Sequence, residues 1–308
     1  LMAAWTGAFL YFGYSVCRSH GDTKLPGYMM VATSLTNIAL DPLYIFVFGW
    51  GLPGAAWATV TSFGIGCLVI YPKLLKRHWV RFDLRELALW KALKQLNGIM
   101  APAMVSQLMP AVSAMLATAL VAGFGSAAVA AWGLGTRLEF FSIVVVLALT
   151  MSMPPMIGRL LGAGDIEQIR KLVRLAVRFV VVWQLAIGLT WVVASGLVSE
   201  LFSSDSDVQK VLAGYLVRVP LSYSGLGVCM LMVSVCNALG LAMRALLVST
   251  LRLFLCFLPL LWIGSQINGV YGLMSGALVG NLFAGAMAYS FYRAGMTRLK
   301  AELASGKA

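Results

Sequence analysis

Long apolar runs alternate with short polar connectors along most of this 308-residue chain. A transmembrane helix needs about 20 apolar residues, and about nine runs meet or approach that length. They lie near residues 1–17, 28–48, 54–71, 98–123, 127–157, 172–200, 210–238, 245–265 and 269–292. Backbone polar groups in lipid need hydrogen-bond partners within their own segment, which favours helices. The pattern therefore predicts an all-α polytopic membrane protein with about nine transmembrane helices.

One segment, residues 72–97, departs from this pattern because basic and apolar residues alternate along it. Such a segment is typical of an amphipathic helix that lies on the membrane surface. It marks the main boundary of the chain. We expect three helices of a first lobe in residues 1–71, a basic cytoplasmic linker in 72–97, a six-helix lobe in 98–293 and a cytoplasmic tail in 294–308.

Composition and charge support a membrane protein and give it an orientation. The chain is 60% apolar and 11% charged, whereas soluble domains are about a quarter charged. The net charge is +12, but the cations lie in connectors, so we expect no nucleic-acid partner. All 23 cations except Arg137, Lys210, Arg218 and Arg252 fall on one side of the threaded helices. By the positive-inside rule this side, with the C-terminus, is cytoplasmic, and the protein lies in the inner membrane.

The second apolar run contains the most informative polar residues, Asn37, Asp41 and Pro42. Burying a carboxylate at bilayer depth costs roughly 2.5–3.5 kcal/mol on insertion scales, so we expect Asp41 to face a protein interior or a wet cavity. Asn37 lies on the same helix face, four residues earlier. Pro42 has no N–H for the carbonyl of Ile38, so the helix should bend here. An acid, an amide and a free carbonyl suit a proton or a small cation. The alternative is a structural Asp held by a neighbouring hydroxyl.

Other chemistry is sparse in the sequence. The five cysteines lie within apolar runs without paired ligand spacing, and the two histidines, His20 and His78, lie in polar connectors. We therefore expect no metal site, no disulfide and no cofactor. Asp41 has no second acid at depth for an intramembrane aspartyl protease, and no Ser/His or His/Glu pattern occurs. The sequence does not favour an enzyme.

The two ends of the chain resemble each other. Residues 15–17 and 234–236 both read Ser-Val-Cys, Gly21 matches Gly240, and Gly51 matches Gly269, all at offsets of 218 or 219. The charges give both three-helix units the same orientation. Parallel repeats about an axis along the membrane normal are a transporter architecture. Because six helices follow the linker and about three precede it, we expect the first lobe to be incomplete at its N-terminus.

Several motifs resemble the multidrug and toxic compound extrusion (MATE) family, especially its DinF-like branch. They occur in the expected order and are Arg18-x-x-Gly21-Asp22-Thr23-Lys24-x-Pro26, Asn37-x-x-x-Asp41-Pro42, Gly54-Ala55-Ala56-x-Ala58-Thr59, Gly125-Ser126-x-Ala128-x-Ala130-Ala131, Arg137-x-Glu139 and Gly162-Ala163-Gly164-Asp165. The resemblance implies a two-lobe bundle. It also implies export of cationic or amphipathic small molecules, such as drugs and toxins, by antiport against H⁺ or Na⁺.

The resemblance further implies a cation site in the first lobe, whose residues match Asn37, Asp41 and Thr59 here. Another branch of the family places an acid on the seventh helix, where this chain has only Gln107. The partners implied are a small-molecule substrate and membrane lipid, and we expect a monomer. The alternative function is a lipid-linked oligosaccharide flippase of the same superfamily. A pyrophosphate group needs several cations, and the inner helices hold few.

Some polar residues within the apolar runs are candidates for a substrate cavity, namely Gln107, Tyr11, Tyr14, Asn237 and Asn281. Most intramembrane amides instead join helices to one another. Arg137 and Glu139 are two residues apart, so we interpret them as a pair with another helix or as residues near the interface. We also expect Arg218 and Arg252 to extend toward the membrane interface.

Overall fold

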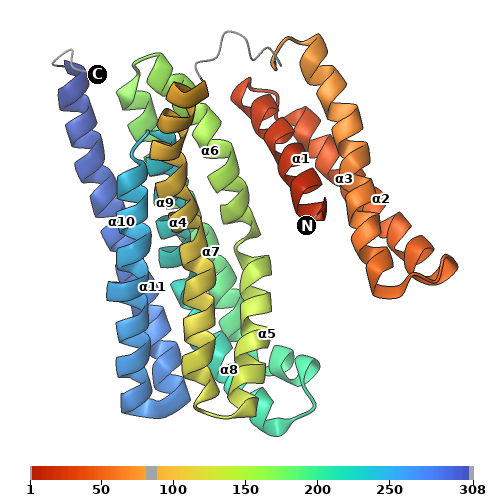
Figure 1. Cartoon of the computed structure of the whole chain (residues 1–308). Helices are drawn as coiled ribbons and strands as arrows, with labels where there is room; N and C mark the ends of the chain where they lie inside the picture. Colours follow the sequence, from red (N-terminus) through yellow and green to blue (C-terminus); the bar gives the residue numbers. More distant parts are fainter. Residues whose placement is uncertain (1, 81–88, 305–308) are drawn as a thin grey trace. The chain divides into compact units, whose positions relative to one another are not determined.

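The computed structural model describes residues 2–80 and 89–304, and every regular element in these residues is a helix. The chain divides into two compact units, Leu1–Leu89 and Trp90–Ala308, coloured red to orange and yellow to blue in Figure 1. This confirms the predicted all-α class.

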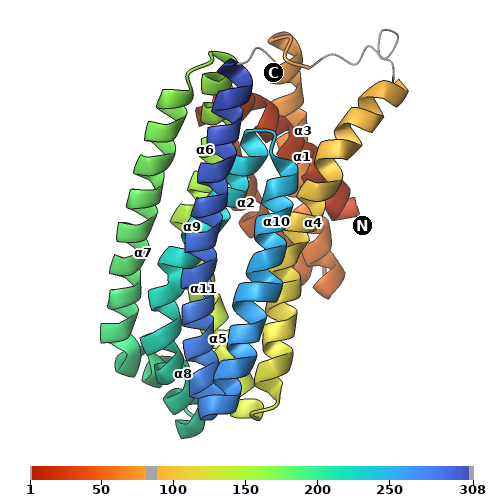
Figure 2. The same cartoon turned by 90° about the vertical axis from the view of Figure 1, so that its left-hand side faces the viewer.

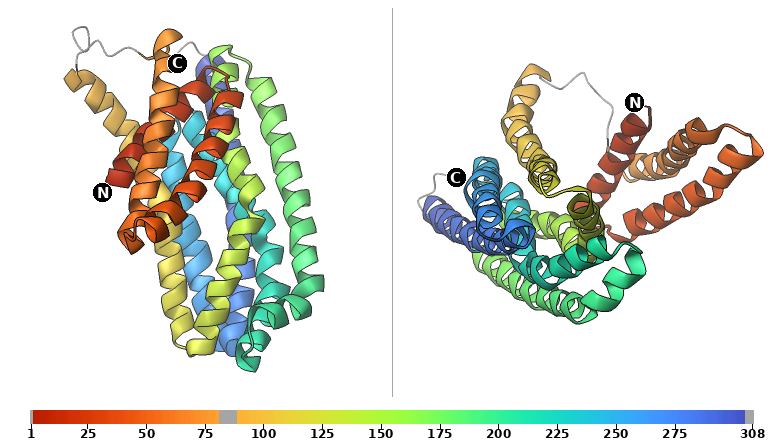
Figure 3. Two further views of the ribbon diagram at one scale, coloured as in Figure 1. Left: turned by 90° about the vertical axis from the view of Figure 1, so that its right-hand side faces the viewer. Right: turned by 90° about the horizontal axis from the view of Figure 1, so that it is seen from below.

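The first unit is a bundle of three helices, shown from two further sides in Figure 3. They are α1 (Met2–Ser19), α2 (Lys24–Pro42) with the π-helical turn η1 (Leu43–Val47), and α3 (Gly51–Lys76). α3 packs against both α1 and α2. Its core joins Leu10, Tyr14 and Cys17 of α1 to Ile70 and Leu74 of α3.

The second unit contains the remaining helices, and Figure 2 shows α7 and α11 running along its length. The elements are α4 (Leu89–Ala122), α5 (Ser126–Ser142), α6 (Val144–Gly162), α7 (Ile166–Phe202), α8 (Ser206–Arg218), the 3₁₀ turn η2 (Val219–Ser222), α9 (Tyr223–Ala238), α10 (Ala242–Leu251), the π-helical turn η3 (Arg252–Phe257) and α11 (Leu258–Ala304). α9 is central, because it packs against α6, α7, α10 and α11, and most of its residues are buried.

Long apolar helices account for most of the crossings that the apolar pattern predicts. Within the described residues, seven helical segments are long and apolar enough to cross a membrane. One of them, Ala242–Thr297, is interrupted by non-helical backbone at Asn268 and Gly269, so it makes two crossings. α1, with 18 residues, is not among these segments. The count of nine helices stays a prediction.

The internal repeat is visible in the backbone. Gly21 and Gly240, which are equivalent in the repeat, have φ values of 84° and 74°. The second equivalent pair, Gly51 and Gly269, has φ values of 56° and 55°. These φ values belong to the left-handed region that glycine enters without steric cost. The repeat therefore preserves the turns that join helices, although few side chains are shared.

The linker expected at residues 72–97 is described only in part. α3 continues past Tyr71 to Lys76, and α4 begins at Leu89. Residues 81–88, on which the surface-helix interpretation depends most, lie outside the described residues. A surface helix over this segment stays a prediction.

Candidate functional site

At Pro42, where the sequence predicts a bend, the helix changes type. α2 ends at Pro42 and passes directly into the π-helical turn η1. The N–H of Leu43 donates to the carbonyl of Leu40, and the N–H of Phe48 donates to that of Leu43. Pro42 lacks an N–H, so the regular ladder is interrupted one residue after Asp41. Single π-turns within helices are frequent at functional sites.

Asn37 and Thr59 meet across the contact between α2 and α3. The Nδ2 of Asn37 lies 3.5 Å from the Oγ1 of Thr59 and donates to it. The Thr59 hydroxyl in turn donates to the carbonyl of Ala55 at 3.1 Å. Because the amide nitrogen of Asn37 is the donor in this series of hydrogen bonds, its carbonyl oxygen remains available as an acceptor. Two of the three residues implied by the resemblance are therefore in contact.

The third residue, Asp41, is half-buried in the first unit. Its Oδ1 is fully buried and has no hydrogen-bond partner. Among the described residues the carboxylate forms no ion pair, since the pairs found there join Arg77 to Asp22 and Lys210 to Asp207. A buried carboxylate oxygen without a donor is costly.

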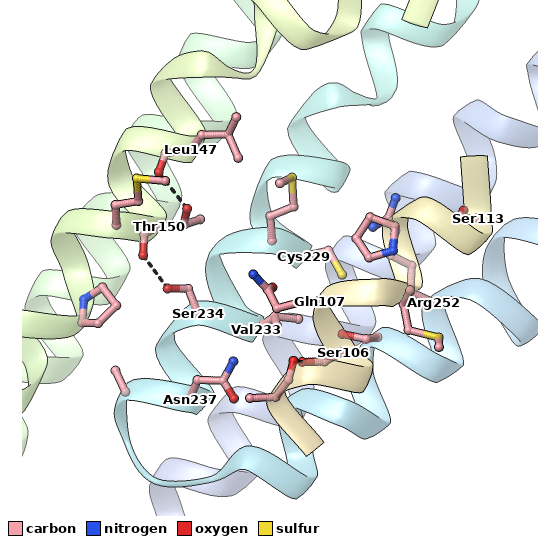
Figure 4. A pocket seen from close by; sticks show the side chains of 18 of the residues that line it. Ser106, Gln107, Ser113, Leu147, Thr150, Cys229, Val233, Ser234, Asn237 and Arg252 are labelled. Carbon is pink, nitrogen blue, oxygen red and sulfur yellow. Dashed lines mark hydrogen bonds between the residues drawn. The ribbon is translucent and has the colours of Figure 1, made fainter. Parts of the chain in front are cut away.

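A larger cavity lies within the second unit, between α4 and the helices α6, α9, α10 and η3. Its volume is about 550 Å³, which falls in the usual range for small-molecule sites. Figure 4 shows Gln107 of α4, Asn237 of α9 and Arg252 of η3 around it. Gln107 and Asn237, both substrate-cavity candidates, thus line one space.

A smaller adjoining cavity of about 140 Å³ receives Asn281, Glu139 and Arg252. The Nδ2 of Asn281 donates to the Oγ of Ser222 at 3.1 Å, so this amide also joins α11 to η2. Glu139 accepts a hydrogen bond from the hydroxyl of Tyr215, 3.3 Å from its Oε2. The ion pair considered for Glu139 is not formed among the described residues; Tyr215 is its partner instead.

The expectation for Arg252 was wrong. Its Nε is buried without a hydrogen-bond partner, and the side chain lines both cavities instead of extending to the interface. Arg252 is the first residue of the π-turn η3, which follows α10 directly. The signal in the sequence was the charge itself, since an intramembrane cation usually marks a functional position.

The two tyrosine candidates belong to the first unit. Tyr14 is buried in the core of that unit, and its hydroxyl has no hydrogen-bond partner. The ring of Tyr11 lies edge-on to it at 6.1 Å, with 52% of Tyr11 exposed. Tyr14 packs in one cluster with Met29, which precedes Asp41 by several turns of α2. Within the unit, these rings therefore lie at a different level from Asp41.

A family model decides the relationship of this chain to known proteins. The model of the MatE family matches residues 102–263, more than half of the chain. The chain belongs to the MatE family. The resemblance found in the motifs is thereby confirmed, and the match includes α4, α6, α9 and η3, which enclose the large cavity.

Relatives of this MatE chain carry transporter names. It is 33% identical over 291 residues to a protein of Shewanella oneidensis named "FAD transporter", with 91% of this chain and 63% of the relative covered. It is 26% identical over 300 residues to the probable multidrug resistance protein YpnP of Bacillus subtilis, with 96% and 67% covered. The chain thus spans about two thirds of the length of these relatives.

Solved structures give the same picture. The Vibrio cholerae MATE transporter VcmN in the bent form has 51% sequence identity and a TM-score of 0.92, and the match covers 96% of this chain and 68% of VcmN. A VcmN mutant gives a TM-score of 0.94 with the same identity and coverage. The chain therefore shares the fold of these MATE transporter structures.

Proposed function

We propose that the whole protein is a secondary active transporter that exports amphipathic small molecules in exchange for H⁺ or Na⁺. The observation that carries the proposal is the buried, unpartnered Oδ1 of Asp41, next to the π-turn η1, in a MatE chain. The coupling ion binds at Asp41. The side-chain amide of Asn37 lies four residues earlier on the same helix, and its hydrogen bond to Thr59 holds it in place.

The exchange follows from the charge of Asp41. With a cation or proton bound, the carboxylate is neutralised and the first unit favours one conformation. When the site discharges, the charge is restored and a second conformation becomes favourable. Substrate and ion then bias the two states in opposite directions, which is coupling in the linkage sense.

The test is transport by the full-length protein in vesicles, driven first by a pH gradient without Na⁺ and then by a Na⁺ gradient. Two dyes are the reporters, the cationic ethidium and the anionic fluorescein. Asp41→Asn keeps the shape of the side chain and removes the charge. We expect it to abolish gradient-driven transport, while Glu167→Gln, at an exposed acid in the first turn of α7, keeps the wild-type rate. Wild-type transport by Asp41→Asn under both gradients would refute the proposal.

A second candidate substrate is FAD, because a relative with 33% identity bears the name "FAD transporter". FAD is amphipathic and anionic, and the cavity of the second unit holds the cation Arg252. Export of FAD from cells that overproduce the full-length protein distinguishes this substrate from ethidium. FAD in the medium at the level of the vector control would remove it.

We also propose that the protein is a monomer in the inner membrane. In the proposed orientation, the connection between α6 and α7, which includes Asp165, faces the cytoplasm. Arg159, Arg170 and Lys171 cluster there, whereas Asp205 and Asp207 mark the opposite end of α7. Membrane-impermeant thiol labelling of Lys171→Cys and Asp207→Cys in intact cells tests it. Only Asp207→Cys should react.

A further inference from the structure

We propose that the large cavity of the second unit binds organic anions, with Arg252 as its charge-pairing residue. This names the class of molecule that the proposed transport carries, and so it rests on that function. It starts from the chemistry of the lining. Of the described residues that line this cavity, Arg252 alone is charged.

Arg252 is available to a ligand. Its Nε is buried and has no hydrogen-bond partner, and it forms no ion pair among the residues that the structure describes. A buried N–H without an acceptor is unfavourable, and the planar fork of a guanidinium matches carboxylate, sulfonate and phosphate groups. An anionic ligand paired with Arg252 would therefore offset this cost.

Glu139 is the nearest competitor for this charge. It lines the smaller cavity, which Arg252 also lines, but Glu139 does not line the larger one. Its Oε2 is already paired with the hydroxyl of Tyr215, and no ion pair joins it to Arg252. Glu139 lowers the positive potential near Arg252 without occupying its hydrogen-bond donors.

The remaining lining describes the body of the ligand. The hydroxyl of Thr150 donates to the carbonyl of Leu147 at 2.7 Å. The hydroxyl of Ser234 donates to the carbonyl of Thr150, also at 2.7 Å, and Figure 4 shows both hydrogen bonds. The amides of Gln107 and Asn237 are the larger polar groups, and the Oδ1 of Asn237 has no partner. These groups suit an N–H or O–H donor on the ligand.

Apolar side chains complete the wall. Three of them are the methionines Met109, Met151 and Met230. Thioethers adapt to irregular shapes and make favourable contacts with aromatic rings. The cavity therefore fits an organic anion with a flat ring, an acidic group near Arg252 and a polar edge near the two amides.

The experiment compares fluorescein and rhodamine 123, which share a xanthene ring system but are anionic and cationic at neutral pH. Binding of each dye to the purified chain in nanodiscs is measured by fluorescence anisotropy at low ionic strength. We expect fluorescein to bind at least about tenfold more tightly than rhodamine 123, as a charge-assisted hydrogen bond predicts. Equal affinity, or tighter binding of rhodamine 123, would overturn the inference.

Two variants locate the site. Arg252→Gln should weaken fluorescein binding about tenfold or more and leave rhodamine 123 unchanged or improved, whereas Arg252→Lys should retain most of the fluorescein affinity. Glu139→Gln should leave fluorescein binding unchanged or tighter. Fluorescein binding that is indifferent to Arg252→Gln would refute the role of Arg252.

Two controls keep the result independent of folding and of transport. In the wild-type chain, naphthalene-1-sulfonate should displace fluorescein and a naphthyl trimethylammonium should not, which requires no variant to fold. Asp41→Asn should bind fluorescein like the wild type, because Asp41 belongs to the first unit. Loss of transport in Asp41→Asn with intact fluorescein binding thus separates a failure of ion coupling from a failure of the anion site.

Discussion

The amide of Asn37 on α2 donates to the hydroxyl of Thr59 on α3 at 3.5 Å. This contact joins the helix that carries Asp41 to its neighbour just before the π-turn. Because the Thr59 hydroxyl also donates to Ala55, the amide of Asn37 is held with its carbonyl oxygen free. In the proposed cation site, these two uncharged residues therefore act beside a carboxylate that neither of them contacts by a hydrogen bond in the structure.

Replacing Thr59 tests this contact. Thr59→Val keeps the shape of the side chain but removes the acceptor for Asn37, which should lower the free energy of unfolding by about 1 kcal/mol. Ion-dependent transport should weaken through a poorer affinity for the ion. Thr61→Val is the control, two residues along α3 and outside the Asn37 contact. Identical ion dependence in Thr59→Val and wild type would contradict the role of the contact.

The pH dependence of stability should report on Asp22 and Arg77, which lie outside the membrane-spanning segments. The N–H of Leu25 and the guanidinium of Arg77, 2.6 Å from the Asp22 carboxylate, lower the pKa of Asp22. A folded-state pKa below the unfolded value of about 3.9 means that the stabilisation is present above that pH. It is lost as the pH falls through the folded-state pKa.

Asp22→Asn should therefore remove part of the acid sensitivity of thermal unfolding between about pH 5 and 3. Arg77 is 46% exposed at its side chain, so solvent screening limits the loss at neutral pH to about 1 kcal/mol or less. Asp207→Asn is the matched control, because its pair with Lys210 is 3.6 Å long and exposed. Equal acid profiles for Asp22→Asn and the wild type would count against this pair.

The start of α3 packs tightly on the π-turn η1. A Cβ added at Gly54 would lie 2.8 Å from the backbone oxygen of Tyr44, whereas one added at Gly64 meets nothing within 4 Å. Gly54→Ala should destabilise the protein by about 1–3 kcal/mol through overpacking. Gly64→Ala should be neutral or stabilising by up to about 1 kcal/mol, because alanine favours the helix. Thermal unfolding compares the stability of the two variants. Equal stability of Gly54→Ala and Gly64→Ala would contradict the tight packing at Gly54.

Much of the fold could be predicted from the sequence because membrane helices are long and apolar. Pro42 also predicted the irregularity in the second helix, because the missing N–H of a proline interrupts the hydrogen bonding of a helix interior. The contact between Asn37 and Thr59 could not be derived from spacing, because it depends on how two helices pack; it came from the family motif. That Gln107 and Asn237 line one cavity could not be derived from spacing either, because it also depends on how helices pack.

The position of the Arg252 side chain in the cavity could not be predicted from the sequence. No proline stands at the start of η3 to signal the π-turn, and the sequence predicted only that Arg252 would extend toward the membrane interface. The internal repeat offered a partial hint, because each of the two three-helix repeats has a π-turn after its second helix begins, η1 after α2 and η3 after α10. The two turns are not at equivalent positions, and the repeat therefore did not place Arg252 in the cavity.

The most direct test of the central claim is infrared difference spectroscopy of the purified protein. Spectra are compared between acidic and neutral pH, and between Na⁺-containing and Na⁺-free buffer, for wild type and Asp41→Asn. The account predicts a carboxyl band that responds to the proton or to Na⁺ in the wild type and is missing in Asp41→Asn. An unchanged set of bands in Asp41→Asn would contradict the assignment of Asp41 as the residue that exchanges the coupling ion.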